Sequence, residues 1–180
     1  MKIGTLNIGH QTLRPRVVPE DLLDALVALD VDLLFLTEYV NTDAYAAALN
    51  RRWAHVLTSV EAPYRGSRCH NQLVALSRLP LGVRDGHQSV PTEAARTNFL
   101  SVEVAGLIVT GMRAPAYKPR DWYAYWDALA RNGSESAIDH ALVRPGVELR
   151  GEAAYHPAFF GRWGLEHCPL VIDVWRECEC

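Results

Sequence analysis

The sequence predicts a mixed α/β sandwich, in which two β-sheets pack together and helices lie outside them. Strand and helix patterns alternate near the N-terminus, and a run of strand patterns follows. Residues 32–36 form a short continuous apolar run, which is typical of a strand buried on both faces. Ala105-Gly106 lies between two strand patterns and predicts a tight hairpin. Hairpins disfavour a wholly parallel, doubly wound sheet.

The first elements follow from apolar spacing and helix-end signals. We predict a strand over residues 2–8. A helix is expected to begin at Pro19, because proline suits the first helical turn and the acidic Glu20 and Asp21 suit the positive helix end. Its leucines recur at helical spacing and predict a face packed on a sheet; they are Leu22, Leu23, Leu26 and Leu29. The apolar run over 32–36 is the second strand.

The rest of the chain is mostly strand. A second helix is expected over residues 42–50, with Thr42 as its N-cap. The next strands are expected over residues 54–58, 72–77, 82–88, 99–104 and 107–111. A third helix is expected over residues 119–130, where Trp122 and Trp126 share one face that we interpret as core packing. The final strands are expected over residues 137–143, 147–155 and 169–175.

Length and composition indicate an ordinary folded domain. The 180 residues suit one domain, which we expect over residues 1–176, with a polar tail over 177–180. A hydrophobic content of 49% and a charged content of 22% exclude a wholly disordered chain. The net charge of −3 argues against a protein that coats nucleic acid non-specifically. This net charge does not exclude an enzyme that binds a few phosphates locally.

Several classes of protein lack support in the sequence. The four cysteines contain no CxxC pair, so neither a disulfide scaffold nor a zinc ribbon is expected. No GxGxxG, GxxxxGK[ST] or GxSxG motif occurs. The sequence therefore lacks the usual signatures of a dinucleotide-binding site, a P-loop and the nucleophile elbow of an α/β-hydrolase. No apolar run approaches the roughly 20 residues of a membrane span, and the N-terminus does not resemble a signal peptide. We expect a cytoplasmic protein, and the sequence leaves its oligomeric state open.

Polar residues beside predicted strands are the candidates for function, because sheets position functional groups at strand ends. Four segments share this design: residues 6–8, 36–38, 138–140 and 166–170. Together they supply one amide, three carboxylates and two imidazoles. Oxygen ligands without a Cys/His set favour a hard cation, Mg²⁺ or Mn²⁺, over zinc.

The residues of these segments, and their order along the chain, resemble the motifs of the endonuclease/exonuclease/phosphatase superfamily. This superfamily includes pancreatic deoxyribonuclease, abasic-site endonucleases, sphingomyelinases and inositol-polyphosphate phosphatases. The matching segments, in chain order, are IGTLNIGH, DVDLLFLTEY, NQLVALSRLPL, LIVTGMRAPAY, SAIDHALVRPGV and EHCPLVIDVW. The resemblance implies a four-layer α-β-β-α sandwich with two packed mixed β-sheets. It also implies hydrolysis of a phosphodiester or phosphomonoester, with a divalent cation and in-line attack by water.

The resemblance assigns roles to individual residues. Asn7 matches the asparagine that helps to orient and hold the metal site, and Glu38 matches the glutamate that ligates the cation. Asp139 matches an aspartate that supports the metal or the histidine. His167 matches the histidine that contacts the scissile phosphate. The alternative roles are structural: a surface acid for Glu38, a backbone-bonded strand-edge carboxylate for Asp139 and a core histidine for His167.

Three further positions complete the candidate site. Glu166 stands where the family carries aspartate, and its longer side chain is expected to reposition the metal or the imidazole. Arg113 stands where many relatives carry histidine or tyrosine; it either clamps phosphate or forms a surface salt bridge. Asn71 is assigned a substrate contact.

One family motif is missing from the sequence. The GDxN segment, whose aspartate positions and deprotonates the attacking water, has no counterpart between Leu129 and Ile138. Its absence predicts a shortened sandwich with an exposed sheet edge. The nearest substitutes for the aspartate are Asp127, Asn132 and Glu135. Three hypotheses therefore stand: a metal-dependent phosphoesterase, a catalytically impaired member that binds phosphate-bearing ligands or a partner protein, and a poorly stable fragment.

Overall fold

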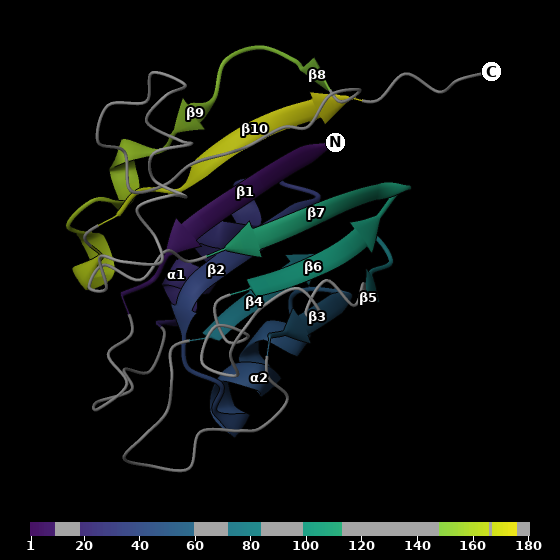
Figure 1. Cartoon of the computed structure of the whole chain (residues 1–180). Coiled ribbons are helices and arrows are strands. Elements are labelled where there is room, and N and C mark those ends of the chain that lie inside the picture. Colours follow the sequence, from purple (N-terminus) through teal and green to yellow (C-terminus); the bar gives the residue numbers. More distant parts are fainter. Residues whose placement is uncertain (10–18, 60–71, 84–98, 113–147, 166, 176–180) are drawn as a thin grey trace, which may run out of the picture.

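The computed structural model describes residues 1–9, 19–59, 72–83, 99–112, 148–165 and 167–175 (Figure 1). Its helices and strands, in chain order, are β1 (Lys2–Asn7), α1 (Glu20–Ala28), β2 (Leu33–Tyr39), α2 (Asp43–Asn50), β3 (His55–Thr58), β4 (Gln72–Ser77), β5 (Gly82–Val83), β6 (Phe99–Val104), β7 (Leu107–Met112), β8 (Glu148–Leu149), β9 (Ala154–Tyr155) and β10 (Leu170–Trp175).

Within this described part, the strands form two sheets. The larger sheet has the order β3-β4-β2-β1-β10-β8, and β9 also pairs with β10; the smaller sheet has the order β5-β6-β7. β1 and β2 are parallel, whereas β10 runs antiparallel to β1 and β4 runs antiparallel to β2. The larger sheet is therefore mixed, as predicted, whereas the described strands of the smaller sheet are all antiparallel.

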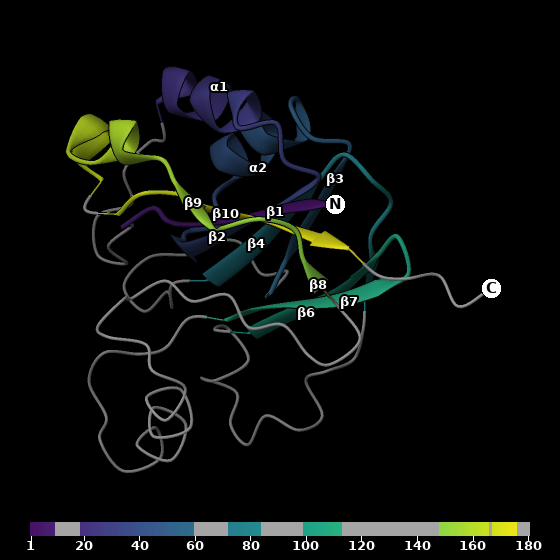
Figure 2. The same ribbon diagram turned by 90° about the horizontal axis from the view of Figure 1, so that it is seen from above.

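The layers are visible when the molecule is seen from above (Figure 2). Helices α1 and α2 cover one face of the larger sheet, and the smaller sheet packs on the other face. The α/β sandwich is therefore confirmed, with helices, larger sheet and smaller sheet as three successive layers. The helix expected over residues 119–130, which would supply the fourth layer, lies outside the described residues, as does the strand expected over 137–143.

Two apolar cores hold these layers together, one on each face of the larger sheet. Because successive side chains of a strand point to opposite faces, β2 contributes to both. Leu34 and Leu36 lie in the core beneath the helices, which we call the helix-side core. Leu33 and Phe35 lie in the core between the sheets, which we call the inter-sheet core. This double burial is what the continuous apolar run predicted.

The helices form where their end signals predicted. On α1, the apolar face is buried at Leu22, Leu23 and Leu26. On α2, the Oγ1 atom of Thr42 accepts a hydrogen bond from the backbone N–H of Tyr45 at 3.2 Å, so the predicted N-cap is confirmed. Arg52, just after α2, forms ion pairs with Glu20 and Asp24 of α1 and joins the two helices. In the described part of the chain, no helix is long and apolar enough to cross a membrane.

The predicted hairpin between β6 and β7 is confirmed. Ala105 and Gly106 both adopt positive φ angles, of 47° and 75°, and connect two strands that pair from Val104–Leu107 to Phe99–Met112. Positive φ at both central residues is the signature of the type I′ turn, whose twist matches that of the flanking strands.

Two strand predictions were wrong in their extent. Residues 147–155 do not form one strand: β8 and β9 are separate, and Gly151 between them has a left-handed φ of 79°. Both short strands pair with β10. The second strand, predicted over 32–36, continues to Tyr39, so Glu38 lies within β2 and not beyond it. Only Gly82 and Val83 of the strand expected over 82–88 lie within the described residues.

Candidate functional site

Two of the predicted site residues belong to the adjacent strands β1 and β2, and a third lies just before β10, which pairs with β1 (Figure 1). Because β1 and β2 are parallel, their carboxyl ends lie side by side, and Asn7 of β1 pairs with Thr37 of β2. Because β10 is antiparallel to β1, its first residue, Leu170, pairs with Thr5 near the same end. His167 comes three residues before Leu170. The topology therefore brings Asn7, Glu38 and His167 to one end of the sheet.

The side chain of Asn7 closes the end of β1. It is 8% exposed, and its Oδ1 atom accepts a hydrogen bond from the backbone N–H of Gly9 at 2.9 Å. Gly9 has a φ of 62°, so the chain turns sharply there. An amide oxygen has two lone pairs, so this hydrogen bond leaves it able to accept a second partner. The side-chain oxygen of Asn7 is thus held in place at the strand end, where it can act as a metal ligand.

Glu38 occupies a β-bulge. Along the pairing of β2 with β4, Leu36 pairs with Val74 and Tyr39 with Gln72, so β2 carries one extra residue between them. Glu38 has a φ of 56°, in the left-handed region that a non-glycine residue adopts only at a cost. Bulges of this kind re-aim side chains and are common beside active sites.

The bulge changes the face to which Glu38 belongs. Leu36 and Tyr39 are three residues apart, yet both lie in the helix-side core. Regular alternation would place them on opposite faces, so the extra residue restores Tyr39 to the helix side. It therefore turns Glu38 to the face on which the smaller sheet packs. The Glu38 side chain is half-buried there.

Asn7 belongs to the same face. Ile3 of β1 lies in the inter-sheet core and Leu6 in the helix-side core, so Asn7, an even number of residues from Ile3, shares the face of Ile3. One carboxylate and one amide oxygen thus lie on adjacent strands, at one end and on one face. These donors fit Mg²⁺ or Mn²⁺, which accept a few protein oxygens and complete their coordination with water.

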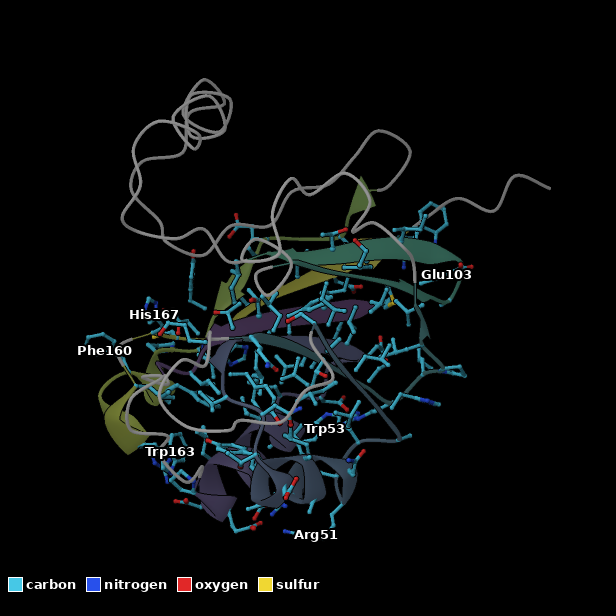
Figure 3. All side chains as sticks on the ribbon, turned by 60° about the horizontal axis from the view of Figure 1, so that its bottom comes forward. Arg51, Trp53, Glu103, Phe160, Trp163 and His167 are labelled. Carbon is cyan, nitrogen blue, oxygen red and sulfur yellow. The ribbon has the colours of Figure 1, made fainter. Side chains whose placement is uncertain are left out.

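His167 lies in the loop that leads into β10. Its side chain is half-buried, as is that of Cys168. The backbone N–H of His156 donates to the carbonyl of Pro169 at 3.1 Å, which fastens this loop to the preceding segment. In Figure 3, His167 lies at the end of the molecule opposite to Glu103 of β6. Extending the β1–β10 register by two residues would place Cys168 opposite Asn7, so His167 is close to the strand end that carries the amide.

The remaining predicted site residues lie outside the described part of the chain. They are Asn71, Arg113, Asp139 and Glu166. Their roles stay predictions. Among the residues that the structure does describe, no three His, Cys, Asp or Glu side chains are grouped to hold a metal ion.

Sequence reasoning missed an aromatic segment at the same end. Tyr155 and Phe160 are 52% and 67% exposed, and they are two of the three exposed large hydrophobic side chains among the described residues. The sequence pattern placed Tyr155 at the end of a long strand and did not single out Phe160. A signal was present, because Pro157 and Gly161 interrupt any regular pattern there. The structure forms two 3₁₀ turns in this segment, Pro157–Phe159 and Arg162–Gly164.

Comparisons with known proteins rest on structure. No protein-family model and no curated protein matches the sequence. Twelve chains of solved structures match, and the three described here cover nearly the whole of this chain. A variant of the 3′ phosphatase NExo from Neisseria, bound to product DNA hairpin, has a TM-score of 0.59 at 15% identity and covers 96% of this chain and 98% of its own.

Two further structures agree. An endonuclease/exonuclease/phosphatase from Beutenbergia cavernae has a TM-score of 0.56 at 15% identity, covering 97% of this chain and 71% of its own. Humanized TDP2 from D. rerio has a TM-score of 0.53 at 12% identity, covering 97% and 98%. At such identities a likeness shows the fold, and this fold is the one that the sequence motifs imply. The chain therefore has the fold of the endonuclease/exonuclease/phosphatase superfamily.

Proposed function

We propose that this protein is a divalent-metal-dependent phosphoesterase, which hydrolyses a phosphodiester in the manner of a nuclease, or a phosphomonoester, by in-line attack of water. One observation carries the proposal. Asn7 and Glu38 share a face at the sheet end where the His167 loop enters β10. These three residues match the family motifs, and the fold is that of known phosphatases and nucleases.

The proposed roles follow from the chemistry of each side chain. Glu38 and Asn7, with Glu166, hold Mg²⁺ or Mn²⁺; when bound, the cation neutralises a phosphate oxygen and stabilises the leaving oxyanion. His167 donates a hydrogen bond to the phosphate as its charge develops. Asp139 orients the imidazole, as a hydrogen-bonded carboxylate commonly does.

Two predicted residues complete the substrate site in this proposal. Arg113 adds a second positive charge to the phosphate and clamps it through its planar fork of N–H groups. Asn71 contacts the substrate. We propose a nucleic-acid ester as the first substrate class to test, because the structural neighbour from Neisseria is bound to product DNA.

The sequence supports a second candidate function, that of a catalytically impaired member which binds phosphate-bearing ligands or a partner protein. No GDxN segment occurs between Leu129 and Ile138. Glu166, which replaces the family aspartate, is a further departure from the active pattern. Without a group that positions and deprotonates water, binding would persist while turnover is lost.

One assay separates the two functions. The purified protein is offered plasmid DNA and a simple aryl phosphodiester with Mg²⁺ or Mn²⁺, with and without a chelator. The test variants are Glu38→Gln and His167→Ala. His55→Ala is the matched control, because His55 of β3 is also half-buried but pairs with Ser77, which lies opposite Leu33 at the other end of the sheet.

The proposal predicts that hydrolysis requires the metal. The rate of hydrolysis is expected to fall by at least about a hundredfold in both test variants and to stay unchanged in His55→Ala. Hydrolysis that persists both with chelator and in His167→Ala would contradict the mechanism. Absence of hydrolysis by a protein that still binds Mn²⁺ in a calorimetric titration would favour the impaired, ligand-binding member.

A further inference from the structure

Residues 155–165, which we call the aromatic segment, border the candidate site. Tyr155 of β9 pairs with Leu170 of β10, which on its other side pairs with Thr5 of β1. Neighbouring strands lie about 4.8 Å apart, so Tyr155 is roughly 10 Å across the sheet from the strand of Asn7. The hydrogen bond from His156 to Pro169 ties the segment to the His167 loop. The segment therefore lies at the same end of the larger sheet as the candidate site.

The aromatic segment is held firmly from beneath. Phe159 is 7% exposed and belongs to the helix-side core, and its ring centroid lies 5.4 Å from that of Trp163. The indole Nε1 of Trp163 donates a hydrogen bond to Asp21 of α1 at 2.8 Å. Two buried or half-buried rings thus anchor the segment to the helical layer.

The backbone of the segment is fixed as well. The N–H of Phe160 donates to the carbonyl of Pro157 at 3.0 Å, and the N–H of Gly161 donates to the carbonyl of Leu165 at 2.9 Å. Gly161 has a φ of 72°, which permits the sharp turn after Phe160. Hydrogen bonds therefore hold the backbone on both sides of Phe160, and its exposed side chain projects outward.

Phe160 differs from its neighbour Phe159 in what it contacts. Phe159 is buried, whereas Phe160 is 67% exposed and contributes little to the core. Figure 3 shows Phe160 and His167 at the same end of the molecule, with Phe160 projecting outward. An apolar ring held out beside a candidate site is suited to a contact with a ligand.

The charges near the Phe160 ring indicate the class of ligand that it would contact. The aromatic segment contains Arg162 and no acidic residue, and the Asp21 carboxylate of α1 contacts it through the Trp163 indole. The Arg162 guanidinium stacks over the Trp163 ring at 4.2 Å, which fixes a positive charge on the segment. A nucleic-acid strand offers both partners that this combination requires, flat bases for the ring and phosphates for the cation.

We propose that Phe160 is a substrate-binding residue, which stacks on an unpaired nucleobase next to the phosphate held at the candidate site. The inference rests on the proposed function and deepens it, because it names a strand of nucleic acid with accessible bases as the substrate class. Stacking is tolerant of base identity, because every base has a π face. Binding is therefore expected to require bases without requiring a particular sequence.

The test measures binding apart from turnover. In a His167→Ala background, fluorescence anisotropy gives the dissociation constants for a single-stranded oligonucleotide and for the same length of abasic sugar-phosphate chain. The quantity compared is the ratio of the two affinities. Phe160→Ala is expected to lower the preference for the base-bearing strand about tenfold, and Phe160→Trp to restore it. Ile108→Ala is the matched control, because Ile108 is also exposed (53%) but pairs with Glu103, far from His167.

Thermal melting of each variant checks folding, and because Phe160 is exposed its removal is expected to leave the melt unchanged. An equal loss of affinity for both chains in Phe160→Ala, or no change in either, overturns the proposal. So does a wild-type affinity that is independent of bases. Vesicles of phosphatidylcholine and phosphatidylserine serve as a third probe. Phe160-dependent binding to them, with no effect on the oligonucleotide ratio, overturns the proposal in favour of a lipid surface.

The outcome is independent of the hydrolysis assay. Base-dependent binding by a protein that cleaves no phosphoester would support the role of Phe160 and reject the proposed enzyme. Hydrolysis of the aryl phosphodiester without base-dependent binding would support the enzyme and reject the role of Phe160.

Discussion

Gly111 of β7 packs directly against the ring of Phe35 of β2. A Cβ atom added at Gly111 would lie 2.7 Å from Cε1 and 2.8 Å from Cγ of Phe35, closer than packed carbon atoms approach. Phe35 is 3% exposed and lies in the inter-sheet core, two residues before Thr37. The absence of a side chain at Gly111 therefore sets how closely the smaller sheet approaches the larger one beside the candidate site.

Gly111→Ala is accordingly expected to destabilise the protein by about 1–3 kcal/mol, the usual cost of overpacking a core. The measurement is the midpoint of denaturant unfolding at unchanged slope. Gly82→Ala is the matched control, because a Cβ at Gly82 would meet the Cβ of Glu103 at an ordinary 3.5 Å. Equal stability of the two variants would show that the sheets are not in such close contact.

The left-handed backbone of Glu38 predicts an inversion of the usual order of alanine and glycine. In an ordinary strand, glycine is less stable than alanine by about 0.5–1 kcal/mol. At a φ of 56° the Cβ atom itself is strained, so Glu38→Gly is expected to be about 1 kcal/mol more stable than Glu38→Ala. Both variants lose the carboxylate, and both are expected to lose phosphoesterase activity.

Glu103 provides the matched pair for this comparison. It is also a half-buried glutamate within a strand, and it is not among the residues with positive φ. Glu103→Gly is expected to be less stable than Glu103→Ala, and both are expected to keep activity. The same order at both positions, measured by chemical unfolding, would mean that Glu38 is not strained.

Two buried tyrosines predict how stability responds to alkaline pH. Burial raises the pKa of Tyr39 and of Tyr45 above the ordinary value of about 10. Their rings meet edge to face at a centroid distance of 5.6 Å, and the Tyr39 hydroxyl donates to Asn41 at 3.3 Å. Because the folded pKa lies above the unfolded one, their contribution to stability is present below about pH 10 and is lost as pH rises through the folded pKa.

An ultraviolet titration of phenolate absorbance checks this expectation. The phenolate absorbance of Tyr39 and Tyr45 should appear together with unfolding of the protein. Tyr39→Phe is expected to weaken the dependence of the unfolding midpoint on pH above about 10. Tyr155→Phe is the control, and an equal effect of the two substitutions would contradict the prediction.

Local sequence signals predicted the elements well where one physical cause dominates. The Thr42 cap and the Ala105-Gly106 turn were confirmed, because a cap hydroxyl and a turn glycine act within a few residues. The polar pair Thr37-Glu38 was interpreted as the end of a strand. The structure continues β2 through it, because pairing with β4 absorbs the bulge, and periodicity does not reveal such a register shift.

The candidate site was predictable only through the family resemblance. Apolar periodicity does not give the order of strands, so it does not place Asn7 beside Glu38 or bring His167 to the same end. The parallel pairing of β1 with β2 and the antiparallel return of β10 do so. The strand predicted over residues 147–155 was wrong because Gly151 adopts a φ of 79°, which a strand pattern does not show. The roles of Asn71, Arg113, Asp139 and Glu166 stay predictions.

Asn7 gives the last prediction, because its two roles respond differently to two substitutions. Asn7→Ala removes the acceptor for the Gly9 N–H and is expected to cost about 1 kcal/mol of stability. Asn7→Asp keeps an acceptor oxygen in the same place and adds a negative charge at the proposed metal site. It is expected to fold as stably as the wild type and to bind Mn²⁺ several-fold more tightly, because oxygen sites gain affinity with ligand charge.

A calorimetric titration with Mn²⁺, run beside denaturant unfolding, measures both effects. Asn50→Asp makes the same charge change at the end of α2 and is expected to leave Mn²⁺ affinity unchanged. If Asn7→Asp and Asn50→Asp bind Mn²⁺ equally, the amide of Asn7 does not face a cation, and its role is confined to closing the turn after β1. If only Asn7→Asp binds more tightly, the carboxyl ends of β1 and β2 hold the metal, because only there does the added charge meet the carboxylate of Glu38 on the same face of the sheet.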